Sequence, residues 1–129
     1  GLTEFKNNGN ILFNNIGSIG IGTGSTIIPS TAKLAVNGKI LATEVQVALV
    51  ANWSDYVFND DYNLKPLNEV ERFINENKHL PDVPSAKEVA IGGINVAKMD
   101  AILLQKIEEL TLYVIELKKE NEILKSKIK

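Results

Sequence analysis

The residue types that could perform chemistry are sparse in this chain. It has no cysteine and one histidine, His79. The lack of cysteine excludes disulfides, thiolate metal sites and cysteine nucleophiles. His79 has no neighbouring histidine or paired carboxylates, which makes it a poor zinc ligand. We expect it to satisfy carbonyl groups at a helix end. The alternative is a ligand contact or a group that titrates near neutral pH.

Two short segments resemble ion or phosphate loops but lack the required spacing. Residues 59–63 read Asn-Asp-Asp-Tyr-Asn, without the ligand spacing or the bidentate glutamate of an EF-hand. We therefore predict a solvated turn there. Gly20 to Gly24 do not fit the GxGxxG pattern, and no Lys-Ser/Thr pair follows them. We predict a tight β-rich segment instead, and neither a metal nor a cofactor.

Aromatic residues cluster in one short segment, and their spacing supports two interpretations. Trp53, Tyr56, Phe58 and Tyr62 lie within ten residues. The favoured interpretation is a strand or turn whose rings fill a small core. The alternative is a ligand surface, in which Trp53, Tyr56 and Tyr62, together with His79, bind a sugar or a protein receptor.

The overall charge and hydropathy exclude two classes of partner. The formal net charge is −2, with acidic and basic residues well mixed, which argues against a nucleic-acid surface and an anionic-membrane anchor. No apolar run reaches membrane-spanning length. The sequence begins without methionine or a signal peptide, and we expect it to be cut from a longer protein.

Composition changes along the chain predict three regions that would have to position these residues. Residues 1–50 are rich in Gly, Asn, Ile and Thr, and predict a β-rich shaft. Residues 51–95 hold Trp53 and His79, and predict a small α/β cap. Residues 96–129 are rich in Leu, Ile, Glu and Lys, and predict a coiled-coil oligomerisation helix. The expected fold class is therefore α+β.

Three short strands are expected in the first region. Residues 16–24 alternate branched apolar residues with Gly or Ser, which is the period of a strand. Residues 32–36 form a second apolar run that ends at an Asn-Gly turn, and residues 39–50 a third. None could bury itself alone, so we expect their partners to come from other chains or stacked repeats.

Two short helices are expected in the second region. The first begins at Pro66, which is favoured at the first helical position, and ends near Asn77. The second begins at Ser85, because Ser85 and Glu88 have the spacing of a capping box. Gly92 and Gly93 would end it.

The third region carries a four-heptad apolar seam, which is the strongest pattern in the chain. Asn95 is the expected N-cap of a helix from about residue 96 to 128. Its apolar positions alternate in steps of four and three, so a lone helix would leave them exposed to water. The a positions are Ile107, Val114, Asn121 and Ile128, and the d positions are Leu103, Leu110, Leu117 and Leu124. These eight residues, called the seam below, predict a homo-oligomer. Asn121 would fix its register.

Several strings in the sequence resemble a known family. Residues 19–23 (IGIGT) and 36–38 (VNG) resemble the shaft motif of phage tail fibres and related bacterial surface fibres. Residues 53–58 (WSDYVF), 79–81 (HLP) and 106–113 (KIEELTLY) are similar to the C-terminal tail-fibre domain common in Bacteroidetes proteins and their phages. The likeness covers nearly the whole chain. The layout of this family, a β shaft followed by a small α/β cap and a terminal helix, is similar to the intramolecular-chaperone ends of tail spikes.

The resemblance implies a structural and adhesive function and no enzyme. It implies three parallel chains, registered and nucleated by this domain, on a virion or a cell surface, with a host glycan or protein receptor. The coiled-coil rule for seam residues predicts a different number of chains, because Val or Ile at a with Leu at d favours two chains. A dimeric adaptor in a surface apparatus is therefore an alternative.

Self-cleavage is a further alternative that the resemblance raises. Self-cleaving members carry Ser-Asp followed by basic residues of the Arg-x-Lys type. This chain has Ser54-Asp55, but Tyr-Val-Phe follows and no basic residue is near. The departure puts self-cleavage in doubt.

Overall fold

The computed structural model describes residues 17–48 and 53–128, and it combines α and β structure as the α+β prediction requires. The chain divides into two compact units, Gly1–Val45 and Gln46–Lys129. In chain order the elements are β1 (Ile19–Ile21), β2 (Leu34–Val36), α1 (Leu67–Asn77), α2 (Ala86–Gly92) and α3 (Val96–Ile128). Each unit is described separately below.

The first unit is built on a two-stranded parallel pair. Ile19 lies opposite Leu34, and Ile21 opposite Val36. The intervening turn passes through Gly22, whose φ of 68° favours glycine. The Gly22 carbonyl accepts a hydrogen bond from the Asn37 side chain at 3.2 Å. The two strands therefore close a short loop without a crossover helix.

Two expectations for the first region are wrong. No strand is assigned within residues 39–48, the described part of the third predicted run, and Leu41 is 94% exposed. A strand needs a hydrogen-bonding partner, and the described chain supplies none there. The expectation that strand partners come from other chains or stacked repeats is also wrong for β1 and β2, which pair with each other. They are also shorter than predicted.

The helices of the second unit begin and end close to the predicted residues. Pro66 was predicted at the first helical position of α1, N1, but it lies one position earlier, at the N-cap. Ser85 and Glu88 form the predicted capping box of α2, and Gly93 follows its last turn with a φ of 67°. The Asn95 side chain accepts a hydrogen bond from the Lys98 amide at 3.0 Å, which caps α3 as predicted.

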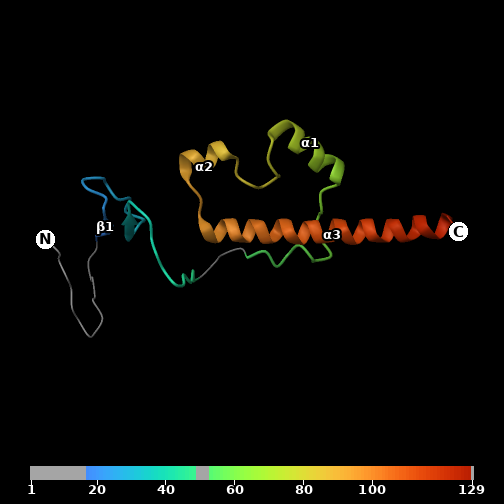
Figure 1. The fold of residues 1–129 in the computed structure, drawn as a ribbon, viewed down its shortest axis with the longest axis horizontal. Coiled ribbons are helices and arrows are strands. Elements are labelled where there is room, and N and C mark those ends of the chain that lie inside the picture. Colours follow the sequence, from blue (N-terminus) through green and yellow to red (C-terminus); the bar gives the residue numbers. More distant parts are fainter. Residues whose placement is uncertain (1–16, 49–52, 129) are drawn as a thin grey trace. The chain divides into compact units, whose positions relative to one another are not determined.

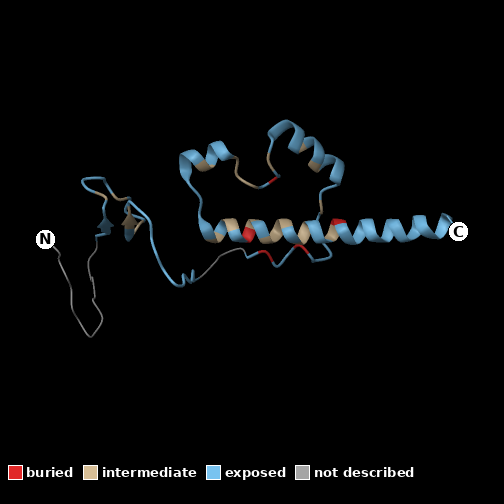
Figure 2. Ribbon diagram, in the orientation of Figure 1, coloured by how far each residue is buried: buried red, intermediate tan, exposed pale blue. Residues whose placement is uncertain are grey.

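α3 is the axis of the second unit, and its two halves differ. Residues 53–65 follow one side of its first half, while α1 and α2 lie on the other side (Figure 1). Every residue from 114 to 128 is exposed, whereas the positions between 101 and 113 alternate between exposed and covered (Figure 2). The first half of α3 therefore packs against the rest of the second unit, whereas the second half does not.

Very little of the described chain is buried. The buried residues there are Ser54, Val57, Pro81, Ala101 and Tyr113. Such a small core stabilises a domain weakly unless other surfaces are covered. Within the described ranges, no helix combines the length and apolar character that crossing a membrane requires.

Candidate functional site

The candidate site is the seam on α3, and all eight of its residues are exposed. Leu103 is 46% exposed, Ile107 61% and Leu110 60%. The exposed fraction stays high in the second half, at 54% for Leu117 and 59% for Leu124. The remaining seam residues, Val114, Asn121 and Ile128, are exposed as well. Leaving such a stripe in water costs about 25 cal/mol for each Å² of apolar surface.

In the first half of α3, the side away from the seam is covered by the chain's own residues 53–65. The buried Ser54 hydroxyl donates a hydrogen bond to the Ala101 carbonyl. Further along, the hydroxyl of Tyr56 bonds Gln105 Oε1 at 2.8 Å, and that of Tyr113 donates to the Lys65 carbonyl at 2.6 Å. In the heptad numbering these α3 residues occupy positions b, f and g. The segment thus follows the back of the helix and leaves positions a and d open.

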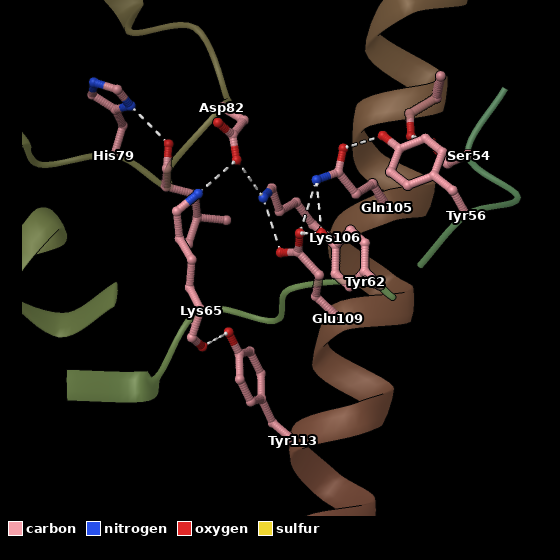
Figure 3. Close-up of polar contacts among 12 residues, drawn as sticks. Ser54, Tyr56, Tyr62, Lys65, His79, Asp82, Gln105, Lys106, Glu109 and Tyr113 are labelled. Atoms are coloured by element: carbon pink, nitrogen blue, oxygen red, sulfur yellow. Dashed lines mark hydrogen bonds and ion pairs between the residues drawn. The ribbon is translucent and has the colours of Figure 1, made fainter. Parts of the chain in front are cut away.

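A polar cluster on α3 ties this segment to the loop after α1 (Figure 3). Tyr62 donates to Glu109 Oε1 at 2.5 Å, and Lys106 Nζ lies 2.9 Å from Glu109 Oε2. The same ammonium lies 3.1 Å from Asp82 in the loop. Lys65 also approaches Asp82, at 3.7 Å. Three separate stretches of the second unit therefore meet around the Lys106–Glu109 pair.

The charges of this cluster stabilise one another. The Lys106 hydrogen bond holds the pKa of Asp82 below its ordinary value. Burial pushes the pKa of Glu109 upward, but hydrogen bonds from Tyr62, Lys106 and Gln105 outweigh it and the pKa falls. Burial and the bond to Glu109 raise the pKa of Tyr62 to about 12. All these groups keep their ordinary charge at neutral pH, so the cluster is structural in character.

A groove lies between α1 and α3 and opens onto the seam. Its volume is about 510 Å³. Leu67 and Val70 of α1 form one wall and the Leu80-Pro81 turn another, and the α3 wall includes seam residues Leu103, Ile107 and Leu110. No residue of α1 is buried. We call this space the α1–α3 groove.

The aromatic segment contributes less to the core than expected. Trp53 is 46% exposed, Tyr56 40% and Phe58 58%, so the core prediction is wrong for these rings within one chain. Residues 57–61 form turns, and the predicted solvated turn at residues 59–61 is confirmed. Val57, at 1% exposure, fills the position next to α3 instead.

The four residues of the alternative ligand surface do not form one cluster. Tyr56 and Tyr62 are neighbours, with ring centroids 5.9 Å apart. His79 packs edge-on against Phe73 of α1, at 5.4 Å between centroids. Figure 3 shows His79 at the far end of the cluster from Tyr56. The arrangement joins two of the four residues and leaves His79 apart from them.

His79 and Ser54 have identifiable structural partners. His79 Nδ1 lies 2.9 Å from the Leu80 carbonyl, next to the helix end where a carbonyl contact was predicted. The Ser54 hydroxyl donates to a backbone carbonyl, which cannot act as a general base. In the described ranges, His, Asp and Glu side chains form no group of three that could hold a metal ion.

Comparison with known proteins leaves the family open. No family model, curated protein or solved structure matches this chain. The resemblance to tail-fibre domains therefore stays a prediction. The site has to be interpreted from its own geometry.

Sequence reasoning missed the residues on the back of α3. Gln105 was not singled out, and Lys106 and Glu109 were treated only as part of a family string, although the three residues hold the cluster together. A signal was present, because Lys106 and Glu109 are three residues apart and therefore adjacent on a helix surface. Their partners Tyr62 and Asp82 are distant in sequence, and no local pattern identifies them.

Proposed function

We propose that this chain is an oligomerisation module at the tip of a fibre, in which α3 joins parallel copies through the seam. The module registers the chains and nucleates the folding of the β-rich segment that precedes it. One observation carries the proposal. The chain covers the back of the first half of α3 with its own residues 53–65 and leaves all eight seam residues exposed.

The length of the exposed stripe supports a helical partner. The seam extends over 26 residues, from Leu103 to Ile128, which is about 39 Å at 1.5 Å per residue. A straight apolar stripe with a period of 3.5 residues matches the same stripe on another α-helix. Because every copy carries it, a second copy of this chain is the simplest partner.

Three copies are proposed, with two as the alternative. The coiled-coil rule for seam residues favours two chains, since Val and Ile occupy a while Leu occupies d. Three chains follow from the resemblance to fibre shafts. With three, the proposed location is extracellular, on a cell surface or virion. With two, an adaptor in a surface apparatus is the better proposal.

The decisive experiment is light scattering after size-exclusion chromatography. The native chain is compared with Leu117→Asp, which places a charge in the seam, and with Lys119→Asp, which places the same charge on the back of the next turn. We expect a trimer mass for the native chain and Lys119→Asp, and a monomer for Leu117→Asp. A monomeric native chain would exclude the proposal, and a mass of two chains would select the adaptor.

Receptor binding is a second candidate, favoured by the exposed aromatic rings. Trp53 and Phe58 lie close in sequence and are about half exposed, which suits stacking on a sugar or an apolar protein surface. A glycan array tests this, with Trp53→Ala as the comparison. Hits that disappear in Trp53→Ala would support the candidate, and an array without hits counts against a glycan receptor.

Self-cleavage is the enzymatic alternative, and the arrangement around Ser54 does not favour it. Its hydroxyl is buried and bonded to a carbonyl, and the ring of His79 packs against α1. The intact mass of a longer protein that includes this chain tests it. One uncut species leaves no cleavage to explain.

A further inference from the structure

The α1–α3 groove lies on one defined flank of the seam. Besides the seam residues, its α3 wall includes Lys106 and Tyr113, which occupy g positions, and Glu109 at a c position. The e positions on the other flank, Leu104 and Thr111, are absent from its lining. α1 therefore stands beside the g flank of its own α3.

In a parallel coiled coil, the g flank of one helix faces the e flank of its neighbour. An element that lies beside the g flank of α3 in one chain is therefore close to the e flank of α3 in the neighbouring chain. From this we infer that the α1–α3 groove of each copy receives the e flank of the neighbouring α3, with Leu67 and Val70 packing on Leu104 and Thr111 of that copy. The inference rests on the proposed function, and it holds for two chains or three.

The e positions change character where the groove ends. Beside the groove they are Leu104 and Thr111, but in the free second half they are Lys118 and Lys125. The g positions next to those lysines include Glu120, which can pair with Lys125 of a neighbour. Uncharged e residues are thus confined to the half of α3 that α1 accompanies, as the inference requires, and the Thr111 hydroxyl is satisfied by the Ile107 carbonyl of its own helix.

The exposed surface of the groove is suited to an apolar partner. Its charged groups are already paired, since Lys106 binds Glu109 and Asp82. What remains open is apolar: Leu67 is 49% exposed and Leu80 44%. A neighbouring helix surface of Leu and Thr would cover these side chains without separating any ion pair.

The absence of cysteine allows a direct test. In one variant Val70→Cys is combined with Thr111→Cys, and in a second with Leu104→Cys. A disulfide needs Cα atoms within about 7 Å, so it reports which residues are neighbours. The expected result in at least one variant, after mild oxidation, is that most of the protein runs on a non-reducing gel as a covalent ring of two or three chains.

Three controls make the result specific. Val70→Cys alone and Thr111→Cys alone should give no ring. Val70→Cys with Lys118→Cys should give none either, because Lys118 lies one heptad, about 10 Å, further along α3. Light scattering and helix content by circular dichroism are recorded for each variant before oxidation.

The outcomes separate the two proposals. An intact oligomer in which neither pair links between chains, or in which the links form within single chains, overturns the groove inference and leaves the seam proposal standing. A native chain that is monomeric overturns both. If a variant loses its helix content, the milder change Val70→Ala is used: a many-fold weaker assembly is expected, whereas an unchanged dissociation constant contradicts the inference.

Discussion

Lys106 is the residue that connects the folded half of α3 to its surroundings. Its side chain is 12% exposed and Glu109 is 15% exposed, so their pairing is shielded from water and salt more than a surface ion pair is. The local sequence marks Lys106 only through its spacing of three residues from Glu109. Its importance comes from Asp82, which pairs with it from the loop after α1, and from Glu109, which joins it to Tyr62 of the preceding segment.

Glu109→Gln tests this cluster. The change keeps the size of the side chain but removes the charge that Lys106 and Tyr62 bind. We expect the free energy of unfolding to fall by about 1–2 kcal/mol, as for hydrogen bonds to charged groups. Chemical denaturation at one fixed protein concentration measures it.

The matched control is Glu122→Gln, further along the same helix. Glu122 lies 3.9 Å from Lys118, and both side chains are more than 60% exposed. An exposed pair of this kind contributes less than about 0.5 kcal/mol. Equal losses in both variants would contradict a structural role for the Lys106 cluster.

The raised pKa of Tyr62 predicts how the stability of the folded chain changes at alkaline pH. This pKa is about 12 in the folded chain, against about 10 when unfolded. The folded state therefore holds the proton more tightly. The resulting stability is fully present below pH 10 and is lost as pH rises through 12.

Tyr62→Phe should make this decline shallower without abolishing it, because Lys106 and Tyr113 also have raised pKa values. Unfolding curves recorded at several pH values between 9 and 12 measure the slope. An unchanged slope in Tyr62→Phe would mean that Tyr62 does not titrate with folding.

At the scale of the elements, the end of α1 holds an unusual residue. Lys78 follows the helix with a φ of 63°, and its amide bonds the Ile74 carbonyl at 2.8 Å. A left-handed residue at a helix end is usually glycine, because a Cβ raises the energy of that conformation. Lys78 is therefore a strained point in the loop that leads to Asp82.

Lys78→Gly should stabilise the protein by about 0.5–1 kcal/mol, since glycine adopts this conformation without steric cost. The shift of the thermal unfolding midpoint measures it. Glu71→Gly is the control, because glycine inside α1 should destabilise by about 1 kcal/mol. Destabilisation by both changes would contradict the left-handed geometry at Lys78.

The helices were predictable because their signals are local. Capping residues such as Ser85 and Asn95, and the heptads after Leu103, are readable from adjacent sequence. The predicted strand over residues 39–50 was wrong in its described part because strand formation depends on a partner, which the sequence of one chain does not reveal. The covered back of α3 was missed for the same reason, since its contacts join residues more than 40 positions apart.

At the scale of the whole molecule, Asn121 is the polar member of the seam. A buried Asn at an a position lowers stability but restricts register and chain number. In the proposed assembly, Asn121→Ile should raise the unfolding temperature by about 5 °C, as for a gain near 1 kcal/mol. The mass distribution should broaden at the same time.

Sedimentation velocity measures that distribution, and Lys119→Ile is the control. It adds the same apolar residue to the back of the helix, so the distribution of the seam-linked assembly should not change. A single unchanged mass for Asn121→Ile would contradict a role of Asn121 in selecting the assembly.

The position of the seam has a consequence for protein synthesis. A chain terminated between Val96 and Leu103 lacks all eight seam residues, although it contains the β segment, α1 and α2. In the proposed assembly such a chain could not join the others. The seam would then act as a selection step, which keeps chains truncated before it out of the fibre.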